Sequence, residues 1–130
     1  MTTRKRVVEA AARKRSAPQV HAIQVLVLPD EDPDTSYLDQ DEFDDRREAY
    51  QRGDFYFVGV RAEAEVAIGG TMQTLKSSGL WGTESDSGDE HFLEIADEEW
   101  HELRKILTDV GVPTSQLPAK VDPKWIKWRV

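Results

Sequence analysis

The chain has 130 residues, of which 38% are hydrophobic and 32% are charged, with a formal net charge of -8. This size and composition are typical of one globular domain with its own core, not of a disordered chain. There is no cysteine, which excludes disulfides, thiolate metal sites and a thiol nucleophile. No apolar run approaches the ~20 residues that span a bilayer, and the start of the chain lacks the apolar segment of a secretory signal. We therefore expect a cytoplasmic protein without a membrane anchor.

The charge is divided unevenly along the chain. The first fifteen residues carry six bases against one acid, whereas the middle of the chain is strongly acidic. We divide the chain into a basic N-terminal tail, residues 1–18, and a single acidic domain, residues 19–130. Such a tail is commonly a solvated arm, and the alternative is an arm that contacts phosphates or an acidic surface. The bases of the tail are Arg4, Lys5, Arg6, Arg13, Lys14 and Arg15.

A strand and a short helix are the first predicted elements. Val20–Leu28 is rich in β-branched and aliphatic residues and is followed by Pro29, which predicts a strand. After an acidic loop, a helix is predicted over Asp41–Arg52, with Asp39 as its N-cap and Gly53 as its C-terminal stop. Few residues of this helix are apolar, so we expect it to lie on the surface.

Two strands joined by a tight turn are predicted next. Asp54–Ile68 begins with aromatic residues and then alternates apolar and charged positions, as a half-buried strand does. Gly69-Gly70 is a two-residue hairpin signal, and Thr71–Leu75 is the expected return strand. The glycines on either side of Leu80-Trp81 predict a turn or bulge there.

The strongest helix prediction is Gly88–Val110. Its apolar residues repeat with the helical period along one side, and its first turn is acidic, as the helix dipole favours. Alternation in Trp125–Val130 predicts a final edge strand. The order strand–helix–strand–strand–helix–strand predicts an α+β fold in which an antiparallel sheet carries two helices on one face. A ferredoxin-like β-α-β-β-α-β arrangement is one topology that fits this order.

Nineteen of the 25 carboxylates lie in two stretches, Asp30–Glu48 and Glu84–Glu102, and the second stretch contains no lysine or arginine. Seven of them fall on fourteen residues of the predicted helix, which is one charge per ~3 Å of helix axis. A single strand of B-DNA presents one phosphate per ~3.4 Å. Because burying unpaired carboxylates is costly, these groups must be solvated or must meet a cationic partner.

Two interpretations of the acidic stretches stay open: a surface that only keeps the protein in solution, or a surface that binds a partner. Our leading hypothesis is a non-enzymatic, nucleic-acid-mimicking domain that binds a basic surface of a host protein. The alternative is a nucleic-acid-associated regulator that uses the six bases of the tail. The sequence leaves the oligomeric state open. The candidate partner-binding residues are Glu90, Glu94, Asp97, Glu98, Glu102, Asp41, Asp44, Asp45 and Trp81.

Other residue patterns give weaker indications. Glu99 falls inside the apolar stripe of the predicted helix, so it needs a partner, and Arg61 or Lys76 could pair with it. A catalytic acid with a raised pKa is the alternative for Glu99. Glu98 and His101 have the Glu-x-x-His spacing of carboxylate-bridged metal sites, but the second such motif is missing. We predict no catalytic residues, no cofactor and no metal site.

A further indication comes from the segment Asp32–Val60 (DPDTSYLDQDEFDDRREAYQRGDFYFVGV), the run Ser78–Ser87 and the closing helix. Together they resemble a group of small accessory proteins encoded on bacterial phages, plasmids and integrative elements. The resemblance covers roughly Val20–Val112. It implies a genomic context and lends no functional residues. Small acidic proteins of mobile elements often resemble inhibitors of host defence, such as anti-restriction and anti-CRISPR proteins, and this analogy favours the leading hypothesis.

Overall fold

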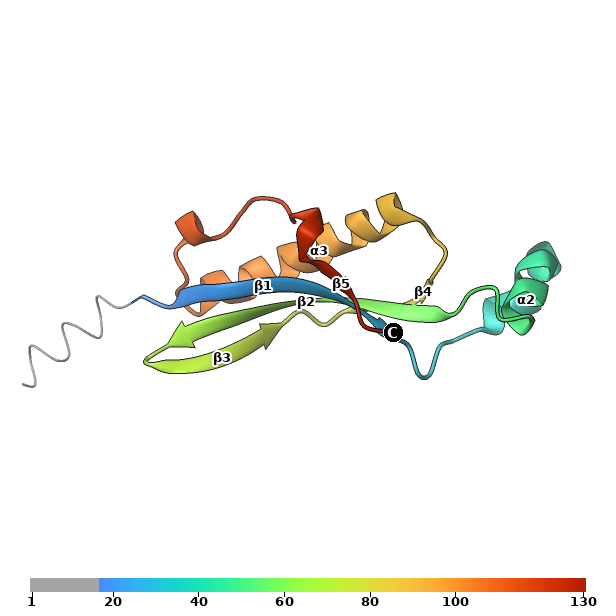
Figure 1. Ribbon diagram of the computed structural model, residues 1–130, viewed down its shortest axis with the longest axis horizontal. Helices are drawn as coiled ribbons and strands as arrows, with labels where there is room; N and C mark the ends of the chain where they lie inside the picture. The colour runs from blue at the N-terminus through green and yellow to red at the C-terminus, as the bar shows by residue number, and fades with distance from the viewer. Residues whose placement is uncertain (1–16) are drawn as a thin grey trace, which may run out of the picture.

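The computed structural model describes residues 17–130, so the bases of the predicted tail from Arg4 to Arg15 lie outside the described residues. Figure 1 shows the arrangement of the elements. Short 3-10 helices also occur in the loops. The main elements are β1 (Gln19–Pro29), α2 (Asp44–Gln51), β2 (Phe57–Ile68), β3 (Thr71–Lys76), β4 (Leu80–Glu84), α3 (Asp89–Asp109) and β5 (Ile126–Trp128).

Within residues 17–130, five strands form one mixed sheet. Four of them lie in the order β3-β2-β1-β5, and the fifth, β4, pairs with β2. β1 and β2 pair antiparallel over almost their whole length, from Gln19 opposite Ala67 to Pro29 opposite Val58. β3 and β4 follow one another along the other edge of β2, each paired antiparallel with a different half of it. β5 pairs with β1 in the parallel direction. The two long central strands are therefore the frame on which the shorter elements assemble.

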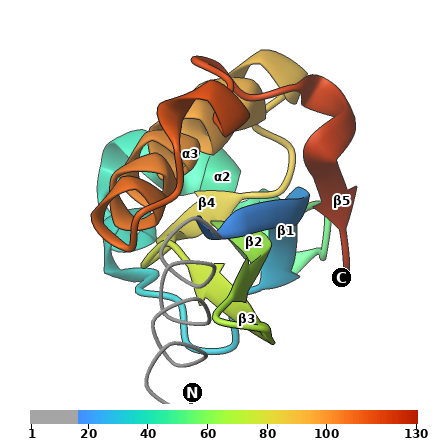
Figure 2. The same ribbon diagram turned by 90° about the vertical axis from the view of Figure 1, so that its left-hand side faces the viewer.

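Helix α3 covers one face of this sheet, as Figures 1 and 2 show from two directions. Trp100, Leu103 and Leu107 on its inner side are fully buried, and they belong to one core with alternate residues of β1 and β2. Burial of each such side chain stabilises the fold by ~1.5–3 kcal/mol. The apolar residues that repeat with the helical period in the sequence are thus the residues of α3 that are buried in the core. The predicted helix Gly88–Val110 is confirmed within a residue at each end.

A second, smaller core lies beyond the end of the sheet. Phe55, Phe57 and Leu38 are buried there, and partly buried aromatic residues from the loop and from α2 pack around them. Several of the rings meet edge to face, the arrangement that aromatic quadrupoles prefer. This cluster holds α2 at the right-hand end of the molecule in Figure 1, away from α3.

The α+β class is confirmed, and three details of the predicted arrangement are corrected. The sheet is mixed, because β5 runs parallel to β1. Helix α2 lies beyond the sheet and not on its face. β1 and β2 are antiparallel neighbours, whereas a ferredoxin-like order would place them parallel with another strand between them. Helix α2 packs on the second core, beyond the end of the sheet, so the connection from β1 to β2 does not cross the sheet face as a connection between parallel strands would.

The region after β3 also differs from the prediction. The sequence predicted one return strand and a turn or bulge at Leu80-Trp81. The chain breaks at Ser77–Gly79 and then re-joins β2 as the separate strand β4, which includes Leu80 and Trp81. The register of β4 against β2 shifts between Val58 and Val60, so an irregularity of the strand pairing does occur opposite Leu80 and Thr83. The Ser77 N–H still donates to the Ala62 carbonyl, and the Ser77 hydroxyl accepts from the Ala62 N–H, so the break continues the pairing with β2. The hydroxyl thus substitutes for a backbone partner.

Candidate protein-binding site

The outer side of α3 carries a row of exposed carboxylates. Glu90, Glu94 and Glu98 are spaced four residues apart, so they lie on one side of the helix, opposite the buried stripe around Leu103. None of the three forms an ion pair with any lysine, arginine or histidine of residues 17–130. We call these three residues, together with Asp97 and Glu102, the acidic α3 face.

Asp97 and Glu102 also have a structural role. The Asp97 carboxylate accepts a hydrogen bond from the Val121 N–H at 3.1 Å and lies 3.6 Å from the His101 ring. The Glu102 carboxylate accepts from the N–H of Ser78 at 3.1 Å and from its hydroxyl at 2.8 Å. These two residues hold loops of the chain against α3. Only the row of Glu90, Glu94 and Glu98 is therefore free of internal partners among the described residues.

The three candidate aspartates near α2 lie at the end of the molecule where α3 begins. Asp41 and Asp45 are exposed and form no ion pair within the described part of the chain. Asp44 accepts from the Arg47 guanidinium at 2.6 Å, one turn later in the helix. Figure 1 shows α2 beyond the start of α3, so these charges extend the acidic surface past the end of the acidic α3 face.

Arg46 connects α2 to the loop before α3. Its guanidinium binds Asp86 at 2.7 Å and Glu84 at 3.1 Å, and it lies 4.0 Å from the centre of the Phe55 ring. The hydrogen bonds that Arg46 donates to Asp86 and Glu84 raise the pKa of Arg46, and the same guanidinium lowers the pKa of Asp86. Arg46 and Asp86 therefore stay ionised at ordinary pH, and the single charge of Arg46 faces two carboxylates.

Carboxylates outnumber bases across the described part of the chain by 24 to 11. Five of these bases form ion pairs: Arg46, Arg47, Arg52, Arg61 and Lys76. They engage five carboxylates: Asp44, Asp54, Glu63, Glu84 and Asp86. Most carboxylates therefore have no lysine or arginine partner within residues 17–130, and the acidic surface is not compensated internally.

Glu99 is buried, as the sequence predicted, but its predicted partners are wrong. Its carboxylate accepts from the Ser77 hydroxyl at 2.9 Å and from the Gly79 N–H at 2.7 Å. Arg61 and Lys76 pair instead with Glu63. The reason is strand alternation: Ala62 faces α3, so its neighbours Arg61 and Glu63 face the opposite side of the sheet. Burial is the main cause of the raised pKa of Glu99.

Trp81 is linked to the acidic α3 face through Ser78, whose carbonyl accepts from the Trp81 indole N–H at 3.4 Å and whose N–H and hydroxyl donate to Glu102. Val58 and Val60 point into the core under α3, so position 59 faces the other side of the sheet. The Trp81 ring covers Gly59 there, so closely that a β-carbon at position 59 would lie 2.0 Å from the ring. Trp81 is 44% exposed and lies on the side of the sheet away from α3. It is a candidate for a contact separate from the helix.

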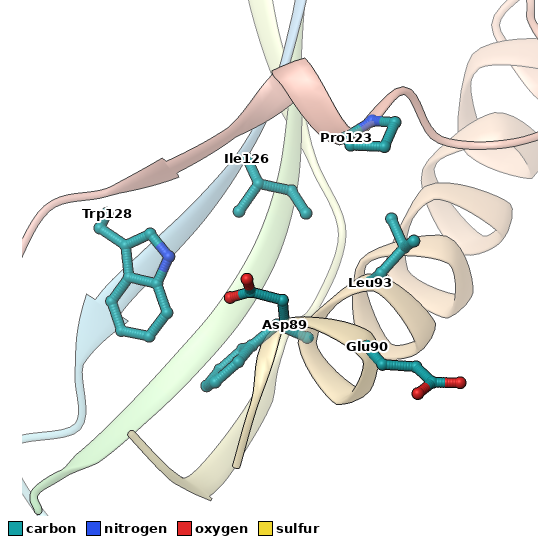
Figure 3. A pocket seen from close by; sticks show the side chains of 7 residues that line it. Asp89, Glu90, Leu93, Pro123, Ile126 and Trp128 are labelled. Atoms are coloured by element: carbon teal, nitrogen blue, oxygen red, sulfur yellow. The ribbon is translucent and has the colours of Figure 1, made fainter. Parts of the chain in front are cut away.

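One feature of the surface was missed by the sequence analysis. A groove of about 440 Å³ lies between the start of α3 and β5, lined mainly by Phe92, Leu93, Ile126 and Trp128 (Figure 3). Its two walls come from segments more than thirty residues apart in the chain. No local pattern could have indicated it, apart from the alternation that leaves Ile126 and Trp128 on the same side of β5.

Two negative findings complete the description of residues 17–130. No group of histidine and carboxylate side chains in this range has the arrangement of a metal site. None of its helices combines the length and the apolar surface needed to cross a membrane.

Comparison with protein-family models, with curated proteins and with solved structures found no match to this chain. The resemblance to accessory proteins of mobile elements stays a hypothesis.

Proposed function

We propose that this protein is a non-enzymatic binding domain whose acidic α3 face docks on a basic, nucleic-acid-binding surface of a host protein. The observation that carries the proposal is the row formed by Glu90, Glu94 and Glu98: three exposed carboxylates without an ion-pair partner in residues 17–130. A field of one sign on a fixed scaffold attracts an oppositely charged partner and speeds its association.

The arrangement of the row supports binding over solubility alone. Like charges four residues apart destabilise an isolated helix by ~0.2–0.5 kcal/mol per pair, and the row contains two such pairs. Solubility depends on the total charge and does not require the charges to be aligned. The core under Trp100 and Leu103 holds the helix in place, so the backbone that carries the row needs no ordering when a partner binds.

The expected partner is a protein that contacts nucleic-acid backbones. Such proteins present lysine and arginine side chains spaced to meet successive phosphates. Carboxylates aligned along one helix offer acceptors to the same side chains, as a nucleic-acid mimic would. The resemblance to proteins of phages and plasmids favours a host defence or DNA-binding protein as the target.

Capture from a lysate of the native host tests the proposal. The test variant carries Glu90→Lys, Glu94→Lys and Glu98→Lys, which leaves the structural residues Asp97 and Glu102 intact. The matched control carries Glu48→Lys, Glu65→Lys and Asp109→Lys, three exposed carboxylates elsewhere. Both variants change the net charge equally. We expect the wild type and the control to capture the same basic protein and the test variant to lose it. Equal capture by all three would refute the proposal.

The alternative function, a nucleic-acid-associated regulator, is favoured by the six bases within the first fifteen residues. A gel shift with DNA and RNA separates the two functions. Under the alternative, the full chain shifts nucleic acid at low salt, and replacing Arg4, Lys5 and Arg6 with glutamine weakens the shift. Under the leading proposal the full chain gives no shift, because the acidic surface repels the phosphates.

A further inference from the structure

The groove between α3 and β5 combines apolar walls with a carboxylate. Figure 3 shows Ile126 and Trp128 on one wall, Leu93 on the other, and the Asp89 carboxylate between them, while the Glu90 side chain points away. Asp89 is exposed and forms no ion pair within residues 17–130. A ligand that fills the groove must therefore present both apolar surface and positive charge.

Trp128 is the central side chain of the groove. Its ring meets Phe92 edge to face, with 4.8 Å between ring centroids, yet 44% of Trp128 stays exposed whereas Phe92 is only 4% exposed. Phe92 thus fixes the orientation of the Trp128 ring and leaves much of its surface open. An exposed indole held in place by a buried neighbour is the kind of residue that contributes most of the energy at protein interfaces.

We infer that this groove binds an arginine side chain, flanked by apolar residues, from a segment of the cationic partner; this inference rests on the proposed function. A guanidinium stacks on an aromatic ring and binds a carboxylate with two parallel hydrogen bonds. Trp128 and Asp89 supply those two groups at one place. The helix dipole places about half a positive charge near Asp89, which the two carboxylates of the first turn outweigh.

The backbone of β5 supports an extended partner segment. β5 has three residues and, within residues 17–130, lies at the edge of the sheet with β1 as its one neighbour. The Arg129 N–H donates to the Val27 carbonyl, so backbone groups of the alternate residues Ile126 and Trp128 face away from the sheet. A peptide lying along this edge could pair with them while its arginine enters the groove.

The groove also lies next to the acidic α3 face, since Asp89 and Glu90 are adjacent residues at the start of α3. The row of carboxylates would steer a basic partner toward the helix, and the groove would then supply specific contacts. Electrostatic steering mainly raises the association rate, whereas a buried side chain slows dissociation. The two parts would therefore affect different rate constants.

The test is an NMR titration of the isotope-labelled full chain with a short capped peptide that has one arginine between two leucines. The matched probe has citrulline, which is uncharged, in place of the arginine. We expect the arginine peptide to shift signals of Phe92, Leu93, Ile126 and the Trp128 indole, and to bind about tenfold more tightly than the citrulline peptide. Equal binding of both peptides, shifts confined to other residues, or no binding would overturn the inference.

Two variants localise the effect. Trp128→Leu keeps the apolar surface and removes the aromatic ring, and Asp89→Asn removes the charge at constant shape. Each should weaken binding of the arginine peptide by about five- to tenfold, and unchanged binding in both would contradict the inference.

If the reversal of Glu90, Glu94 and Glu98 abolishes host-protein capture while these two variants bind the peptide normally, the groove inference alone fails. If the peptide binds in the groove but the reversal leaves capture intact, the proposed function fails.

Discussion

At the residue scale, Glu99 shows how one buried carboxylate joins two elements. It extends from α3 and accepts hydrogen bonds from Ser77 and Gly79, where the chain breaks between β3 and β4. The side chain pays a desolvation penalty for this position, and the penalty is the main reason that its pKa is raised from the ordinary value of 4.5. A neutral side chain of the same shape would avoid that penalty.

Glu99→Gln therefore has a predictable dependence on pH. Because the pKa of Glu99 is raised on folding, the folded protein binds more protons than the unfolded chain between 4.5 and the raised value. This contribution to stability is present below the ordinary pKa and is lost as the pH rises through the folded pKa. Urea unfolding from about pH 4 to about pH 8 should show a smaller loss of stability in Glu99→Gln than in the wild type. Identical pH dependence would contradict this assignment.

Gly59 is a second position where a single added atom, a β-carbon, should change the stability of the fold. A β-carbon there would collide with the Trp81 ring, so Gly59→Ala should destabilise the protein by ~1–3 kcal/mol through overpacking. When Trp81→Ala is present in the same chain the collision disappears, so Gly59→Ala should then change the free energy of unfolding only slightly. Chemical unfolding of the two single variants and the double variant measures this coupling. Additive effects would show that the ring does not cover Gly59.

At the element scale, α2 and α3 belong to different cores, and Arg46 connects them. Arg46→Met removes the ion pairs with Glu84 and Asp86 but keeps apolar surface over Phe55. Because these side chains are partly exposed and water screens their charges, the global stability should fall by no more than ~1 kcal/mol. Hydrogen exchange should become faster in α2 and stay unchanged in the middle of α3. Equal acceleration in both helices would mean that the two cores unfold together.

How far each element could be predicted depends on where its determinants lie. The twenty-one residues of α3 carry their own period, so the sequence alone indicated the helix and its buried side. The placement of α2 depends on contacts with Phe55 and Phe57, which no local pattern encodes. The split between β3 and β4 depends on Ser77 and on Glu99, which lies 22 residues further along the chain. Long-range partners of this kind decide register and topology.

The same distinction applies to the candidate site. Glu90, Glu94 and Glu98 could be identified from composition and helical spacing, because a carboxylate opposite the apolar stripe is necessarily exposed. That Asp97 and Glu102 also hold Val121 and Ser78 was not predictable, since their partners lie more than twenty residues away. The groove at Trp128 was missed for the same reason.

At the scale of the whole molecule, the described part of the chain is an α+β scaffold with far more negative than positive charge. The charges lie along the outer side of α3 and at the end of the molecule where α2 lies, while the core beneath α3 keeps the helix in place. We propose that these carboxylates attract a basic partner over a long range, and that the groove between α3 and β5 then makes specific contacts with it. The attraction should respond to salt, because exposed charges are screened over ~8 Å at physiological ionic strength.

The most direct measurement is the association rate constant of the captured host protein with the wild-type chain as a function of salt. We expect the association rate constant to fall at least tenfold between about 0.05 M and about 0.5 M salt, with a smaller change in the dissociation rate constant. The Glu48, Glu65 and Asp109 control should keep most of this salt dependence, whereas the Glu90, Glu94 and Glu98 reversal should show no association above background at any of these salt concentrations. An association rate that does not change with salt in the wild type would contradict the account.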